Sequence, residues 1–206
     1  MARPKKYNVD SRSYLKRARI QLDSRSYEGL FYAAFELRCG IEERMQEYLE
    51  GHNHIPKSIK KEWRLGNLDK AILKYFGDSN RITQVTVRQI EKPHEEFTAY
   101  YTPVTPELIK IGQKLGNLLH AQKKFISPDA SFWNKTRNLL ERAYMLLEIS
   151  NKGTLMGPPI WDKNTKRAKF IAMPNCDHEL DKYKQIVKKG EQIELEIKHL
   201  KEFPES

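Results

Sequence analysis

Apolar residues recur at intervals of three and four positions between Ser24 and Gly51. The residues on this repeating face are Tyr27, Leu30, Phe31, Ala34, Leu37, Ile41, Met45, Tyr48 and Leu49. The spacing is typical of an amphipathic helix, because a strand would alternate at every second residue. A serine hydroxyl can cap a helix N-terminus and a glycine often ends a helix, so Ser24 and Gly51 are the expected limits. The pattern predicts one long helix against which the other elements pack.

Similar spacing predicts further helices along the chain. We expect a first helix from Ser11 to Leu22, which the dipeptide Asp23-Ser24 separates from the long helix, so that the two form an antiparallel hairpin. The other expected helices are 57–65 and 67–76, divided by Gly66-Asn67 and ended by Gly77-Asp78; 105–122, with Thr105 as cap and Pro106 in the first turn; 130–150, after Ser127-Pro128-Asp129; and a short one over 178–188.

Alternating patterns predict several short strands. We expect a hairpin of residues 82–90 and 97–102, and a second hairpin of residues 160–161 and 170–172. Between residues 190 and 197, isoleucine and leucine alternate with glutamate, as in a half-buried strand. These elements predict an α+β, mainly α fold: an antiparallel helical bundle with an inserted β-hairpin and a small C-terminal antiparallel sheet. The expected organisation is a disordered basic arm over 1–10, a helical domain over 11–152 with its hairpin near 82–102, and a β-rich elaboration over 153–206.

The charge of the chain points to an anionic partner. There are 37 Lys and Arg against 27 Asp and Glu, a formal net charge of +10. The first 25 residues hold eight basic and two acidic side chains. Nucleic acid is the favoured partner over a membrane, because no aromatic-rich amphipathic anchor accompanies the charge; the alternative is a merely soluble basic protein. With two cysteines, no apolar run of membrane-spanning length and no secretory signal, we expect a cytoplasmic protein without a membrane partner.

Arg38 and Glu42 lie one turn apart within the long helix, between Ala34, Ile41 and Met45. The favoured interpretation is a half-buried ion pair at the edge of the apolar face, since such pairs are common four residues apart on helices. The alternative is that Arg38 faces a cleft and contributes positive charge to a binding site.

The helix predicted over 105–122 carries a second group of polar candidates. His120 is near its C-terminus, where the helix dipole favours the protonated imidazole, and Asn117 precedes it by three residues on the same face. Lys114 lies further back, displaced around the axis, and Gly112 and Gly116 leave the backbone accessible to a close neighbour or ligand. A histidine in this position can also be a simple capping residue.

Four features of the sequence together resemble the HEPN superfamily. They are the helical hairpin of residues 11–51, the run Tyr27-Glu-Gly-Leu-Phe-Tyr-Ala-Ala-Phe-Glu-Leu-Arg38 followed by Ile41-Glu42, the pair Gly51-His52, and the later helix ending on Leu-Leu-His120. The resemblance covers about residues 11–150 and implies a bundle of four or five helices, commonly dimeric. Many members are metal-independent ribonucleases of prokaryotic defence and toxin systems. Their motif is an arginine followed, after four to six residues, by a histidine. His120 matches the histidine, whereas Lys114 stands at the arginine position, and lysine keeps the charge but lacks the bidentate fork.

The resemblance implies a chemistry in which the RNA 2′-OH attacks the adjacent phosphorus, His120 transfers protons and Lys114 offsets developing charge. His120, Lys114 and Asn117 are therefore the candidate catalytic residues. Because lysine replaces the family arginine, we favour RNA binding over RNA cleavage. The resemblance also implies a homodimer and a defence-system protein as a further partner. The alternative is a non-catalytic dimerisation or adaptor module that binds a protein. The candidate nucleic-acid contacts are Arg38, Lys16, Arg17, Arg19, Lys123 and Lys124. No cofactor and no metal are expected, because the pairs His52/His54 and Cys176/His178 lack the spacing of a zinc motif.

Overall fold

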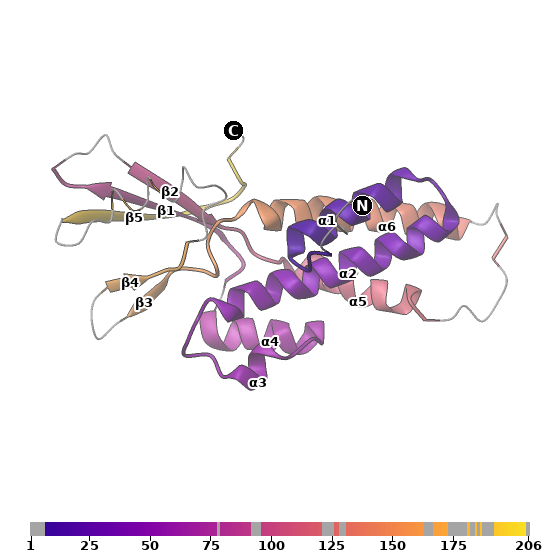
Figure 1. Cartoon of the computed structure of the whole chain (residues 1–206), viewed down its shortest axis with the longest axis horizontal. Coiled ribbons are helices and arrows are strands. Elements are labelled where there is room, and N and C mark those ends of the chain that lie inside the picture. Colours follow the sequence, from indigo (N-terminus) through magenta and orange to yellow (C-terminus); the bar gives the residue numbers. More distant parts are fainter. Residues whose placement is uncertain are drawn as a thin grey trace, which may run out of the picture. The chain divides into compact units, whose positions relative to one another are not determined.

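The computed structural model describes residues 7–77, 79–91, 96–120, 126–127, 131–162, 167–172, 181, 184, 186 and 192–204. The chain divides into two compact units. We call Met1–Gln46, Lys61–Lys70 and Val104–Asn151 the helical unit, and Glu47–Lys60, Ala71–Pro103 and Lys152–Ser206 the sheet unit. The predicted α+β, mainly α class is confirmed at this coarse level, because long helices dominate and the largest sheet is small (Figure 1).

The helices are α1 (Ser11–Asp23), α2 (Tyr27–Glu50), α3 (Lys57–Lys60), α4 (Leu65–Phe76), α5 (Pro106–Leu118) and α6 (Ser131–Lys152). The strands are β1 (Ile82–Gln89), β2 (Glu96–Tyr101), β3 (Ile160–Asp162), β4 (Arg167–Lys169) and β5 (Ile193–Leu200). Within the described parts of the chain, every helix is too short or too polar to cross a bilayer. The helix predicted over 178–188 falls largely outside the described residues.

Helices α1 and α2 form the predicted antiparallel hairpin, but Ser24 does not cap α2. Ser24 instead ends α1, where its N–H donates to the Ile20 carbonyl at 3.2 Å. Arg25 then takes a left-handed conformation with φ 55°, and the hydroxyl of Ser26 accepts from the Gly29 N–H at 2.9 Å. The prediction was wrong by two residues because α1 extends through Asp23 and uses Ser24 for its own closure.

The last residues of the predicted N-terminal arm contact α1. Residues 1–6 lie outside the described part, but residues 7–10 make specific contacts. Asp10 caps α1 by accepting from the Ser13 N–H at 2.9 Å. The Arg17 guanidinium lies over the Tyr7 ring, 4.2 Å from its centroid, and donates to the Asn8 carbonyl at 2.8 Å. These contacts connect part of the arm, which was predicted to be disordered, to α1.

The core of the helical unit forms where α1, α2, α5 and α6 lie side by side (Figure 1). Its fully buried side chains have the three- and four-residue spacing of the predicted faces and include Ala18, Leu22, Leu37, Ile41, Met45, Leu108, Leu115, Leu140 and Leu147. Tyr27 differs from the prediction, since it is 43% exposed and stacks on Trp133 with 4.3 Å between ring centroids. The apolar face of α2 thus begins one turn later than the sequence pattern indicates.

Helices α3 and α4 correct the prediction of a break at Gly66-Asn67. Helix α3 ends at Lys60, and α4 begins at Leu65 and continues through Gly66. The cause lies in Glu62, whose carboxylate accepts from the N–H groups of Trp63 and Arg64 and from the Asn67 amide at 2.7 Å. These hydrogen bonds lower the pKa of Glu62 to about 2. The start of α4 is therefore fixed by a side chain that the local pattern does not single out.

The sheet unit contains an antiparallel sheet of order β2-β1-β5. Val85 of β1 lies opposite Ala99 of β2 and Ile197 of β5. The structure thereby joins the hairpin near 82–102 to the C-terminal strand, which the sequence interpretation keeps apart. The first hairpin is confirmed, and β3 and β4 also pair, but β4 ends at Lys169, just before the predicted strand 170–172, and Ala172 instead bridges to Leu155. Strand β5 is less covered than expected, because Ile193 and Ile197 stay exposed.

Candidate functional site

The outer face of α5 carries a row of polar side chains. Thr105 caps the helix by accepting from the Leu108 N–H at 3.2 Å, and Pro106 occupies the first turn, as predicted. Leu108, Ile111 and Leu115 are buried, so Lys110, Lys114 and Asn117 project into solvent from the other face. Spacings of four and three residues place them in one line along the axis. We call Lys110, Lys114 and Asn117 the α5 stripe; within the described residues, none of the three has an ion-pair partner.

His120 lies beyond the end of α5. The helix was expected to reach about residue 122, but it ends at Leu118, because Leu119 closes it with a tight turn in which its N–H donates to the Gly116 carbonyl at 3.2 Å. His120 is exposed and lines an open pocket of about 670 Å³. The other lining residues are Phe31, Tyr32, Phe35, Glu36, Leu118 and Leu119, and we call this space the aromatic pocket.

The aromatic pocket is mainly apolar. Tyr32 is 62% exposed and Phe35 is 47% exposed, so both rings are open to a ligand. Glu36 has its carboxylate 2.8 Å from Nε of Arg17, which offsets its charge. The residues that line the aromatic pocket include His120 but neither Lys114 nor Asn117. The structure therefore brings His120 together with aromatic rings, and the predicted trio of His120, Lys114 and Asn117 does not share one pocket.

Arg38 makes contacts inside the helical unit. Its Nε lies 2.9 Å from Oε1 of Glu42, and Nη1 donates to the Gly112 carbonyl at 3.2 Å. Both side chains are largely covered, with 20% and 18% of their area exposed. Burial raises the pKa of Glu42, and the Arg38 charge partly offsets that effect. The predicted half-buried ion pair is confirmed, and the Arg38 guanidinium is engaged between α2 and α5.

The other predicted nucleic-acid contacts divide into paired and unpaired cations. Arg17 is bound to Glu36, and Arg19 lies 2.9 Å from Glu141 and 4.0 Å from the centroid of the Tyr144 ring. Lys16 is exposed and makes no ion pair with any described residue. Lys123 and Lys124 lie outside the described residues.

Sequence reasoning missed the aromatic wall of the pocket. Tyr32 and Phe35 fall off the repeating face of α2, so the helical pattern places them toward solvent. Large aromatic side chains at solvent positions are the signal that could have identified them, because exposed apolar surface often marks a binding site. Lys110 was missed as well, since it precedes the residues that resemble a known motif.

His52 of the sheet unit serves its packing. His52 is buried, and its Nε2 lies 2.8 Å from the Met156 carbonyl oxygen, beside the ring of Phe76. Burial lowers the pKa of His52, so the neutral imidazole is the form that the fold holds. Cys176 and His178, considered with His52 and His54 as metal ligands, lie outside the described residues. Over the part of the chain that is described, no cluster of three metal-ligating side chains occurs.

Comparison of the chain with protein-family models, curated proteins and solved structures found no match. The resemblance to the HEPN superfamily therefore stays a prediction, supported by the motifs quoted above.

Proposed function

We propose that this protein binds single-stranded RNA along the α5 stripe and in the aromatic pocket. The observation that carries the proposal is the juxtaposition of two chemistries along one helix. Lys110 and Lys114 project from α5, and His120, which follows the end of this helix, lines a pocket walled by Tyr32 and Phe35.

Each part of this surface suits a different part of an RNA strand. Ammonium groups neutralise phosphates, and a formal net charge of +10 favours such contacts across the molecule. Unpaired bases stack on aromatic rings, which every base can do because each has a π-face. A duplex could not use the rings of Tyr32 and Phe35 in this way, since its bases are already stacked on one another. Single-stranded RNA therefore fits the combination better than a duplex.

Metal-independent endoribonuclease activity in a prokaryotic defence or toxin-type system is the extension that the HEPN resemblance implies. In that hypothesis His120 moves protons at the 2′-OH, and Lys114 offsets charge on the phosphorane. One imidazole has to serve as base and acid in turn unless a second copy of the chain supplies its own His120. Binding is the primary proposal, because Lys114 lies outside the pocket that His120 lines.

The mainly apolar lining of the aromatic pocket favours a second candidate, a dimerisation or adaptor module. Tyr32 and Phe35 are large exposed rings on one side of α2, and a partner chain could cover them. The two candidates differ in their response to salt: phosphate contacts weaken steeply as salt rises, whereas apolar contacts do not.

The test is fluorescence anisotropy with a short labelled single-stranded RNA at several salt concentrations. The double variant Lys110→Gln/Lys114→Gln should bind about tenfold more weakly. Its slope of log affinity against log salt should be shallower by about 1.4, because each lost phosphate contact removes about 0.7 for a single strand. Tyr32→Ala should weaken binding by about 1–3 kcal/mol without changing the slope, since stacking involves no counterion release.

Lys61→Gln/Lys70→Gln is the matched control, because both lysines are exposed in the helical unit but neither belongs to the α5 stripe or lines the aromatic pocket. Equal losses in this control and in the α5 double variant would contradict the proposal, as the binding would then reflect net charge alone. If RNA does not bind but Tyr32→Ser converts a dimer to a monomer in sedimentation, the adaptor function is correct. Cleavage in the presence of EDTA that is equal for wild type and His120→Ala would remove His120 from any ribonuclease mechanism.

A further inference from the structure

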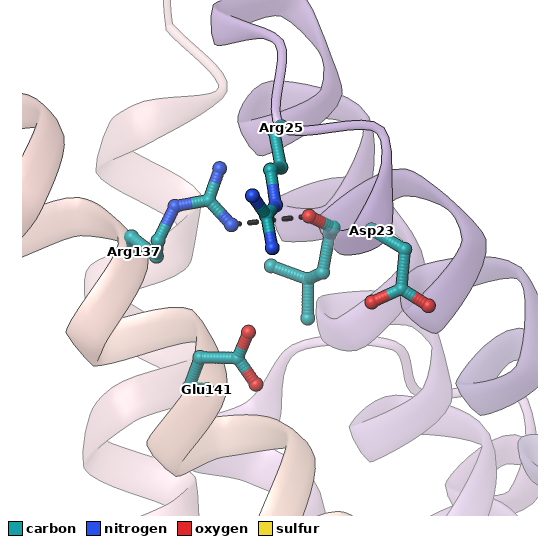
Figure 2. A pocket seen from close by; sticks show the side chains of 5 residues that line it. Asp23, Arg25, Arg137 and Glu141 are labelled. Carbon is teal, nitrogen blue, oxygen red and sulfur yellow. Dashed lines mark hydrogen bonds between the residues drawn. The ribbon is translucent and has the colours of Figure 1, made fainter.

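A second pocket in the helical unit is lined by charged side chains. It has a volume of about 680 Å³ and is lined by Leu22, Asp23, Arg25, Arg137 and Glu141 (Figure 2). Arg25 belongs to the connection between α1 and α2, whereas Arg137 and Glu141 project from α6. We call this space the arginine pocket; it shares no residue with the α5 stripe or the aromatic pocket.

Two guanidinium groups are directed into the arginine pocket. Nη1 of Arg137 donates to the Leu22 carbonyl at 3.0 Å, which holds the head group in place while leaving its other N–H groups for a ligand. Arg25 has a left-handed backbone, and Figure 2 shows its side chain extending from the connection toward Arg137. Neither guanidinium forms an ion pair with a described carboxylate. Two like charges directed into one space are unfavourable unless an anion joins them.

The carboxylates at the edge of the pocket are engaged by a third arginine. Arg19 binds Glu141 in a bidentate manner, with Nη2 at 2.9 Å from one oxygen and Nη1 at 3.4 Å from the other. Nη1 of Arg19 also lies 3.4 Å from Asp23, whose side chain is 64% exposed and points away from the two guanidinium groups in Figure 2. Because Arg19 offsets these acids, the charges of Arg25 and Arg137 remain for a ligand.

We propose that Arg25 and Arg137 bind the phosphate group of a phosphomonoester. Such a group carries a charge of about −1.5 to −2 at neutral pH and three acceptor oxygens, which matches two guanidinium heads. A carboxylate would satisfy one head and leave the other uncompensated. The inference is independent of RNA binding, because its ligand is a small phosphorylated molecule and its residues differ from those of the proposed RNA surface.

The experiment is isothermal titration calorimetry of the full chain at low salt. The probes are uridine 5′-monophosphate, inorganic phosphate and uridine. We expect saturable one-site binding of the monophosphate and much weaker binding of uridine, because a single base stacked in the aromatic pocket contributes only about 1–3 kcal/mol. Arg25→Gln and Arg137→Gln should each weaken the affinity at least tenfold, because each removes a charge-assisted contact. Glu141→Gln should strengthen it several-fold, since a negative charge at the pocket edge disappears.

Lys135→Gln is the matched control, because it removes a positive charge from the same helix without lining the pocket, and its affinity should stay within twofold of wild type. If Arg137→Gln fails to fold through loss of the Leu22 contact, Arg25→Gln on the exposed connection carries the test.

Tighter binding of the monophosphate than of inorganic phosphate identifies an esterified ligand, and equal binding identifies the free ion. Absence of saturable binding, uridine binding as tight as that of its monophosphate, or an unchanged Arg25→Gln variant would each overturn the inference. Lys110→Gln/Lys114→Gln should leave these titrations unchanged, so failure of the RNA proposal and failure of this one are separable.

Discussion

Arg38 and Glu42 form a half-buried pair in which burial and charge act against each other. Burial penalises the Glu42 carboxylate and raises its pKa, while the guanidinium 2.9 Å away partly compensates. A partner removed from such a pair leaves an uncompensated charge, which costs more than the intact pair contributes. Replacement of Arg38 therefore distinguishes a structural role, which predicts a loss of stability, from a role in nucleic-acid binding, which predicts a loss of RNA affinity.

Replacement of Arg38 by methionine should lower the free energy of unfolding at pH 7.5 by about 1–3 kcal/mol, because the Glu42 carboxylate loses its counter-charge. The loss should be smaller at pH 5. Without Arg38 the pKa of Glu42 rises further in the folded state. At low pH Glu42 is protonated in both the folded and the unfolded state, and the variant pays no charge penalty. The loss of stability then grows as the pH rises through the folded-state pKa of Glu42, because the buried carboxylate ionises. Urea denaturation at the two pH values measures both effects.

The double variant Arg38→Met/Glu42→Gln is the control, since it should recover much of the loss and remove the pH dependence. A loss that is the same at both pH values would show that packing and not charge is responsible. A stable Arg38→Met variant that no longer binds RNA would instead assign Arg38 to the nucleic-acid surface.

At the scale of elements, the close approach of α5 to its neighbours depends on Gly112. A Cβ at this position would lie 2.7 Å from Cδ1 of Leu65 and 3.2 Å from Cδ1 of Ile41. The sequence leaves the space beside Gly112 open to a neighbour or a ligand. In the structure, Leu65 of α4 and Ile41 of α2 fill this space. This packing fixes α5, and with it the positions from which Lys110, Lys114 and His120 are presented.

Gly112→Ala should lower the free energy of unfolding by about 1–2 kcal/mol, because the clash with two buried side chains exceeds the gain in helix propensity. Gly66→Ala in α4 is the matched control: its nearest neighbour would be Nε2 of Gln113 at 3.8 Å, an ordinary contact. This variant should raise stability by about 0.5 kcal/mol through propensity alone. Thermal or urea unfolding of the two variants should give opposite signs, and equal signs would contradict the packing argument.

At the scale of the whole molecule, the sheet unit is assembled from segments that are far apart in the chain. Strand β5 pairs with β1 along its full length, from Leu200 opposite Ile82 to Ile193 opposite Gln89. Without β5, β1 and β2 would form a two-stranded hairpin, which is marginally stable in water. The C-terminal strand is thus part of the same sheet as the hairpin that precedes it by about a hundred residues.

Removal of residues 192–206 should lower the hydrogen-exchange protection of the β1 amides, because half of the β1 ladder loses its partner. The amides of α6 should keep their protection, since their hydrogen bonds lie within that helix. A chain that ends at Leu200 is the control, as it retains β5. Exchange measured by mass spectrometry on peptides from residues 82–89 and 131–152 tests this, and unchanged protection of β1 in the longer truncation would contradict it.

The elements were largely predictable because their signals are local. The caps at Thr105 and Pro106, the left-handed Gly77 that ends α4, and the apolar spacing of α2 act over a few residues each. The errors came where a local signal had two uses. Ser24 suited the start of one helix and served the end of another, and Gly66 suited a break but lies inside a helix that begins at Leu65.

The candidate site was less predictable, because it depends on which side chains meet. His120 and Lys114 could be identified as exposed polar candidates near a helix end, but Tyr32 and Phe35 reach the same pocket as His120 only through the packing of α2 against α5. Arg25 and Arg137 are more than a hundred residues apart in the sequence, and no periodicity relates them. Arg17 and Arg19 were predicted to contact nucleic acid, but they form ion pairs with Glu36 and Glu141. These acids lie on other helices, so the sequence pattern around each arginine does not reveal the pairing.

The sequence by itself determined the mainly helical class, the approximate positions of the long helices and of the first hairpin, and the excess of positive charge, because periodicity, caps and composition are properties of short segments or of simple sums. The tertiary structure decided the pairing of β5 with β1, the filling of the Gly112 gap, and the partition of the arginines into paired and ligand-accessible groups. Those outcomes depend on distances between residues remote in sequence, which are set only when the elements pack.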